Sequence, residues 1–129
     1  ITLQKIDHDQ NHKDIPFSVF KPTGLGSIDI YEKISLGQAL SDTEQQAWER
    51  TLQRWSTIFE RAHELQVPVM VDAEESWMQA SVDDLVIGFM KTYNKERALV
   101  YNTSQLYRHD RLAHLQQALA DAKEGAYIY

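Results

Sequence analysis

An amphipathic helix that runs directly into an apolar strand constrains the fold of this chain more than any other feature. In residues 41–66, apolar side chains recur at three- and four-residue spacing along one face, and the opposite face is charged. The apolar residues of this stripe are Trp48, Leu52, Trp55, Phe59, Ala62 and Leu65. Ser41 and Glu44 have the spacing of a capping box, which predicts where the helix starts. Pro68 ends it, and residues 67–71, VPVMV, have the composition of a buried strand.

The same alternation of strand and helix is repeated on both sides of this unit. Further strands are expected at residues 15–21, 97–103 and 126–129, and further helices at residues 81–93 and 110–124. Helices between near-continuous apolar strands indicate βαβ units and a parallel sheet. The predicted fold class is therefore α/β, with about four parallel strands and intervening helices. Such a chain forms either a small open sheet or part of a (β/α)8 (TIM-like) barrel, and a partial barrel leaves two open edges.

Local signals predict where several of these elements begin and end. Pro22 disfavours a helical conformation for Lys21 and, with two nearby glycines, marks a turn after the first strand. Ser81, which an aspartate follows three residues later, is expected to cap the helix that runs to residue 93. Asp110 is the expected N-cap of the last helix, and Gly125 is its expected stop.

Length, charge and composition limit the classes of protein to consider. The 129 residues suffice for one domain, taken here as residues 1–129, and the net charge of −6 without a basic block argues against nucleic-acid binding. The chain has no cysteine for disulfides or thiolate metal sites, which fits a cytoplasmic protein, and no apolar run near the ~20 residues that span a bilayer. Residues 1–14 are weakly patterned and are expected to form a helix end or a connection. Because the chain lacks an initiator Met and ends in apolar GAYIY, we expect a piece cut from a longer protein.

Polar side chains follow three of the expected strands, at the point where each strand ends. They are Lys21 after the first strand, Asp72, Glu74 and Glu75 after the second, and Asn102, Thr103 and Gln105 after the third. Any one of these positions alone is equally well explained as a solvated strand end. The carboxyl ends of parallel strands meet at one rim, however, so the three together favour a functional site that brings a cation, a carboxylate and an amide into proximity. A lysine that faces a carboxylate there would keep both groups charged.

Metal sites have weaker support in the sequence. His8 and His12 are four residues apart, but no third ligand is evident. Asp72 and Glu74 share a strand face and could bind Mg²⁺. A magnesium-dependent (β/α)8 enzyme that uses these two carboxylates is therefore one alternative, and a small acidic α/β binding module, complete as it stands, is another. No metal is assigned.

Four sequence segments are similar to proline dehydrogenases, especially the stand-alone bacterial and mitochondrial type. The segments are VFKPTGLG, VPVMVDAEES, KTYNKERALVYNTSQLYRHDRLAHL and AKEGAYIY, and the resemblance covers nearly the whole chain beyond about residue 17. It implies a distorted (β/α)8 barrel that binds FAD and oxidises L-proline to Δ¹-pyrroline-5-carboxylate, the first step of proline catabolism. Hydride passes to flavin N5, and a quinone, usually at a membrane, then accepts the electrons.

The resemblance also implies roles for individual residues. Lys21 matches a lysine that contacts the substrate carboxylate, and Asp72 matches the acidic residue treated as part of the catalytic site. Ala73 matches the position whose backbone touches the flavin, and Asn102 matches an amide that hydrogen-bonds the flavin ring. Ser104 departs from a position where the family more often has Tyr, which puts local packing in doubt.

Other family motifs are absent from this chain, namely an arginine in an RGAY-type sequence and paired arginines that clamp the substrate carboxylate. The resemblance therefore implies a central portion of the barrel. We expect this portion alone to be inactive, to bind FAD poorly and to self-associate through its open edges.

Overall fold

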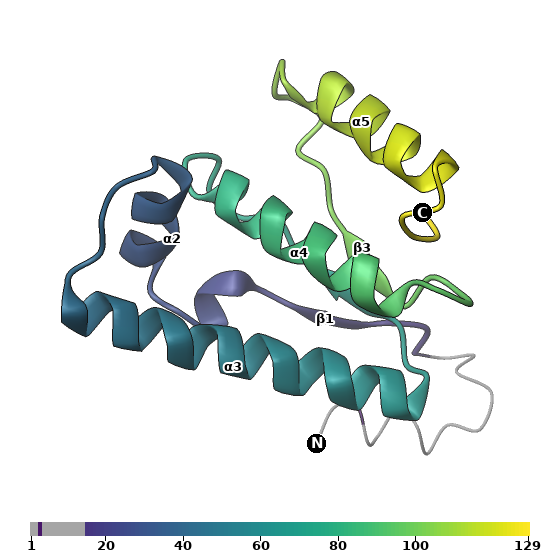
Figure 1. The fold of residues 1–129 in the computed structure, drawn as a ribbon, viewed down its shortest axis with the longest axis horizontal. Helices are drawn as coiled ribbons and strands as arrows, with labels where there is room; N and C mark the ends of the chain where they lie inside the picture. Colours follow the sequence, from purple (N-terminus) through teal and green to yellow (C-terminus); the bar gives the residue numbers. More distant parts are fainter. Residues whose placement is uncertain (1–2, 4–14) are drawn as a thin grey trace.

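The computed structural model describes Leu3 and residues 15–129 and has a three-stranded parallel sheet at its centre (Figure 1). The strands are β1 (Ser18–Phe20), β2 (Val69–Val71) and β3 (Val100–Asn102), in the order β1-β2-β3. This confirms the predicted α/β class and the parallel pairing. The predicted helix end or connection at residues 1–14 lies outside the described residues apart from Leu3, and so do His8 and His12.

The sheet buries one face under the helices, and its other face is only partly covered by the residues that the structure describes. Val69 pairs with Ser18 and Val100, and Val71 pairs with Phe20 and Asn102, so these residues lie on one face. Val69, Val71 and Val100 belong to the same buried cluster as residues of the helices α3 (Asp42–Leu65) and α4 (Gln79–Tyr93). The middle row of the ladder, Val19, Met70 and Tyr101, lies on the opposite face. Val19 is 56% exposed, which shows that this face is uncovered at β1.

The core under the sheet is strongly aromatic. Trp55 and Phe59 of α3 are almost fully buried, and Phe20 of β1 packs edge-on against Trp55 with ring centroids 5.1 Å apart. Phe89 of α4 lies 4.5 Å from Phe59 and stacks on Trp55. The stripe predicted from the sequence therefore does face the core, and the capping box at Ser41 is present as predicted.

One predicted helix cap is wrong, and one helix was not predicted. The short helix α2 (Ile28–Ser35) follows β1 and was not recognised. Ser81 does not cap α4, because the helix begins two residues earlier at Gln79. The Ser81 hydroxyl instead donates to the carbonyls of Tyr31 and Met78 at 3.0 and 2.9 Å, which joins α4 to α2.

The last helix and the residues after it also differ from the prediction. Helix α5 (Arg111–Lys123) starts after Asp110 as expected, but the Asp110 side chain makes no capping bond, and Gly125 follows in a left-handed conformation. The predicted strand at residues 126–129 is wrong. Ile128 hydrogen-bonds to Asn94, through its amide at 2.8 Å and its carbonyl at 3.1 Å, instead of pairing with β3. Figure 1 shows α5 displaced from the sheet, beyond the loop that follows β3.

Candidate functional site at the carboxyl end of the sheet

Lys21 and Asp72 form an ion pair at the carboxyl ends of two neighbouring strands. Pro22 holds Lys21 in an extended conformation directly after β1, and the Asp72 amide donates to the Phe20 carbonyl at 3.0 Å, which extends the ladder by one bond. The Lys21 Nζ atom lies 2.9 Å from Asp72 Oδ2. The hydrogen bond and the negative charge of Asp72 raise the pKa of Lys21. The lysine side chain is 61% exposed, so an anionic ligand can reach it.

Glu74 fixes the turn that directly follows Lys21. This turn is the 3₁₀ segment η1 (Pro22–Gly24). Both oxygens of the Glu74 carboxylate accept hydrogen bonds from Thr23, one from its amide and one from its hydroxyl, each at 2.8 Å. Glu74 therefore ties the loop after β2 to the turn after β1, while Glu75 is exposed. The two loops are therefore joined twice, by the hydrogen bonds from Thr23 to the Glu74 carboxylate and by the Lys21–Asp72 ion pair.

Side chains of α2 and α3 support the same turn. The Tyr31 hydroxyl donates to the Pro22 carbonyl at 3.2 Å and accepts from Trp55 Nε1 at 2.8 Å. Burial raises the pKa of Tyr31 to about 12, so the hydroxyl keeps its proton at neutral pH. Arg54 donates to the Leu25 carbonyl at 2.6 Å. The backbone around Lys21 is thus held by side chains from α2 and α3.

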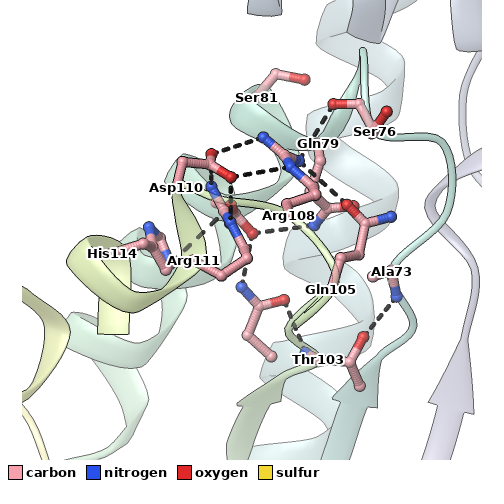
Figure 2. Close-up of polar contacts among 12 residues, drawn as sticks. Ala73, Ser76, Gln79, Ser81, Thr103, Gln105, Arg108, Asp110, Arg111 and His114 are labelled. Atoms are coloured by element: carbon pink, nitrogen blue, oxygen red, sulfur yellow. Dashed lines mark hydrogen bonds and ion pairs between the residues drawn. The ribbon is translucent and has the colours of Figure 1, made fainter. Parts of the chain in front are cut away.

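Ala73 lies where the ends of β2 and β3 are joined. Its amide donates to Thr103 Oγ1 at 2.5 Å (Figure 2). The same hydroxyl donates to the Val71 carbonyl at 3.0 Å. Beyond Thr103, the Gln105 side chain donates to the Glu74 carbonyl, and Arg108 donates to the Ser76 carbonyl at 3.2 Å. These contacts connect the loop after β3 to the loop after β2 along most of its length.

Asn102 does not join Lys21 and Asp72. As the last residue of β3 it points toward the helices, where its Nδ2 atom donates to Asp83 Oδ1 at 2.9 Å. Its Oδ1 atom accepts from the Thr103 amide at 3.0 Å. The structure thus brings together two of the four predicted site residues, places Ala73 beside them and puts Asn102 on the other side of the sheet end. The role of Asn102 in flavin binding stays a prediction.

A cavity of about 240 Å³ lies on the Asn102 side of the sheet, between α4, β3 and α5. Its polar lining includes Asp83, Asn102, Arg111 and His114. Asp83 and Arg111 are almost completely buried and form an ion pair that the sequence analysis missed. The signal was present in the helical spacing, because Asp83 lies four residues after Gln79 and three before Val86, which are both on the buried face of α4.

Metal binding and membrane spanning have no structural support in the residues that the structure describes. Among residues 3 and 15–129, no group of three or more His, Cys, Asp or Glu side chains is arranged to hold a metal ion. Within the same residues, no helix combines the length and the apolar character needed to cross a bilayer.

The fold and site define this chain as a parallel α/β structure, with a cation and a carboxylate paired at the carboxyl end of the sheet. The sequence profile of the family described as proline dehydrogenase matches residues 2–129. The chain therefore belongs to the proline dehydrogenase family, as its motifs predicted.

The chain is also similar to individual proteins. The carbapenem antibiotics biosynthesis protein CarD of Pectobacterium carotovorum subsp. carotovorum is 35% identical over 99% of this chain, which spans 34% of that protein. The mitochondrial proline dehydrogenase 1 of Caenorhabditis elegans is 34% identical over 71% of the chain, and that of Drosophila melanogaster is 30% identical over 67%. Those matches span 15% and 13% of the two proteins. No solved structure matches the chain.

Proposed function

We propose that this chain supplies part of a proline dehydrogenase active site, in which L-proline is oxidised to Δ¹-pyrroline-5-carboxylate. The observation that carries the proposal is the Lys21–Asp72 ion pair at the carboxyl end of the sheet, in a chain of this family. In the complete enzyme, the three strands would be part of a (β/α)8 barrel, and the open face that bears Val19 would face its interior.

Lys21 is proposed to bind the carboxylate of proline. A lysine ammonium group is a compact cation with three donors, and its raised pKa keeps it charged across the neutral range. Asp72 accepts one hydrogen bond from Lys21 and so orients the ammonium group. The other N–H groups of this exposed ammonium can donate to the substrate carboxylate. Asp72 is accordingly the acidic residue of the proposed catalytic site.

The residues near the pair differ in how well they fit an FAD cofactor. Ala73 follows Asp72 directly, and because its amide is engaged by Thr103, a flavin ring would meet its carbonyl or methyl group. Asn102 fits less well, because Asp83 and Thr103 already hold its amide on the far side of the sheet end. FAD, when bound, would accept the hydride removed from proline. Lys21 would hold the substrate carboxylate so that the reacting carbon stays in place.

The remaining features of the proposal come from the family resemblance. The electron acceptor of the complete enzyme is proposed to be a quinone. The complete enzyme is proposed to be bacterial and cytoplasmic, and to associate peripherally with a membrane. The isolated 129-residue chain is proposed to be inactive and to bind FAD poorly. It is also proposed to self-associate, because association would cover the open edges and exposed apolar surface of the sheet. Light scattering at high concentration tests the last point, and a monomer would contradict it.

The experiment that tests the function compares full-length protein with its Lys21→Met variant. Addition of L-proline should bleach the visible flavin absorbance of the full-length protein. Lys21→Met should raise KM for proline at least tenfold, because a charged hydrogen bond contributes about 1.5–3 kcal/mol. Lys123→Met, which removes an exposed lysine at the end of α5, is the matched control and should leave KM unchanged. A full-length protein without flavin, or one that proline does not bleach, would refute the proposal.

The match to CarD favours a second candidate, a role in antibiotic biosynthesis, since it covers 99% of the chain. Deletion of the gene separates the two candidates. Loss of growth on proline as sole nitrogen source supports the catabolic function, and normal growth on proline with a lost secondary metabolite supports the biosynthetic one.

A further inference from the structure

Asp83 is a buried carboxylate that collects three hydrogen bonds from three different elements. It lies on α4 and is only 3% exposed. Its Oδ1 atom accepts from Gln79 Nε2 and from Asn102 Nδ2, both at 2.9 Å. Its Oδ2 atom accepts from Arg111 Nη1 at 2.5 Å. A buried carboxylate is unfavourable unless it is paired and hydrogen-bonded, and Asp83 meets both conditions through these donors.

Arg111 brings the start of α5 to this carboxylate. It is the first residue of α5 and is 7% exposed. One side of its guanidinium group binds Asp83, and the Nε and Nη2 atoms bind Asp110 at 3.2 and 2.5 Å (Figure 2). The hydrogen bonds from Arg111 hold the pKa of Asp110 well below its usual range. The guanidinium fork thus fixes the start of α5 against α4 in one orientation.

From Asp83, hydrogen bonds continue through β3 to the proposed site. Asn102 donates to Asp83 and accepts from the Thr103 amide, which fixes both ends of its side-chain amide. Thr103 in turn accepts from the Ala73 amide. The series therefore starts at Arg111 and ends at the residue directly after Asp72.

The short sheet makes these side-chain contacts important for position. The ladder between β2 and β3 ends at the pair Val71 and Asn102. Ala73 lies beyond this last pair, and Thr103 supplies its hydrogen bond through a side chain. Ala73 is therefore held by Thr103, whose hydroxyl also donates to the Val71 carbonyl and whose amide donates to Asn102 Oδ1.

We propose that Asp83 and Arg111 are positioning residues for the active site. They hold the Asn102 amide and, through Thr103, set the place of Ala73 next to Asp72. The catalytic meaning of this arrangement rests on the proposed function, whereas the positioning itself does not. Neither residue touches the Lys21–Asp72 pair, so their effect on that pair is indirect.

Hydrogen exchange of the full-length protein, measured by mass spectrometry, tests the positioning. Asp83→Asn should increase the exchange rate of peptides that contain Ala73 and Thr103 about fivefold, because a charged acceptor is replaced by a neutral one. Peptides from the middle of α3 should keep their exchange rate. A general loss of stability would instead increase exchange in α3 as well. Asp84→Asn makes the same change at the exposed neighbouring residue and should have no effect.

A second variant keeps the test decisive if Asp83→Asn does not fold. Arg111→Lys retains the charge but loses the guanidinium fork, and it should increase exchange in the same two peptides by a smaller factor. Unchanged exchange at Ala73 and Thr103 in a folded variant, or an equal increase in α3, would overturn the proposal. Flavin content and KM for proline are measured in parallel. Protein without flavin whose exchange changes as expected would refute the proposed function and leave the positioning intact.

Discussion

Replacement of Gly26 by alanine should destabilise the turn next to Lys21. A Cβ atom at Gly26 would lie 2.7 Å from both Cγ2 and Oγ1 of Thr51 and 3.2 Å from Cε2 of Tyr31. Neither neighbour can move freely. Thr51 is 2% exposed and donates to the Ala47 carbonyl at 3.0 Å, and Tyr31 is fully buried. Overpacking of this kind costs about 1–3 kcal/mol, which is the expected decrease in the free energy of unfolding.

Two further variants separate the steric effect from the general effect of a Gly→Ala change. Gly88 lies within α4 with nothing within 4 Å of its added Cβ, so Gly88→Ala should stabilise the protein by about 0.5–1 kcal/mol. Thr51→Ala removes both atoms that would lie 2.7 Å away. Gly26→Ala and Thr51→Ala together should therefore destabilise less than the sum of their separate effects.

Urea unfolding followed by tryptophan fluorescence provides the measurement, at one fixed protein concentration because self-association would shift the midpoint. Trp55 is buried beside the turn and should report on its loss. If Gly26→Ala unfolds within about 0.5 kcal/mol of the unsubstituted protein while Gly88→Ala stabilises as expected, the close approach of Gly26 to Thr51 is refuted.

Two other variants test the contacts around the site and the helix that supports it. Glu74→Gln removes the charged acceptor of both Thr23 donors and should speed hydrogen exchange at the Thr23 amide, whereas Glu75→Gln, at the exposed neighbour, should not. The hydrogen bond from Lys33, followed by those of the capping box, lowers the pKa of Glu44 from 4.5 to about 2. The stability that this carboxylate contributes is therefore present above pH 4.5 and is lost as the pH falls toward 2. Glu44→Gln should reduce that dependence of the urea midpoint on pH, and an unchanged profile between pH 4.5 and 2 would contradict the assignment.

Strands and long helices could be predicted because their signals are local. The stripe of α3 and the apolar run of β2 each lie within one continuous segment, and both were found at nearly the correct bounds. Helix α2 was missed because its stability depends on distant contacts. The Ser35 hydroxyl donates to the Met78 carbonyl at 2.8 Å and accepts from the Ser81 amide at 3.0 Å. A helix of only eight residues has little stability of its own, so such contacts decide whether it forms.

The fourth predicted strand failed for a related reason. Residues 126–129 are apolar and aromatic, which is typical of a strand, but a strand forms only where a neighbouring strand offers its backbone. The backbone carbonyl of Asn94 accepts from the Ile128 amide, and the Asn94 Nδ2 atom donates to the Ile128 carbonyl. The Asn94 Oδ1 atom also accepts from the amides of Leu99 and Val100. One buried asparagine at the end of α4 thus replaces a strand partner, and composition alone does not reveal this.

The division of the predicted site could have been read from the sequence by following the alternation of side chains. Residues that pair across a parallel ladder point to the same face, so the next row after Phe20, Val71 and Asn102 begins with Lys21 and Asp72 and includes Thr103. Asn102 lies on the same face of the sheet as the buried residue Val100, and Thr103 lies on the same face as Asp72. The family resemblance pointed to the asparagine, whereas the alternation of side chains along β3 places the threonine on the side of the ion pair. The contact between Thr103 and Ala73 agrees with this placement of Thr103. Asn102, on the other face, connects β3 to Asp83. The end of β3 therefore makes contacts on both faces of the sheet. Thr103 contacts Ala73 at the proposed site, and Asn102 contacts Asp83 of α4 on the other face.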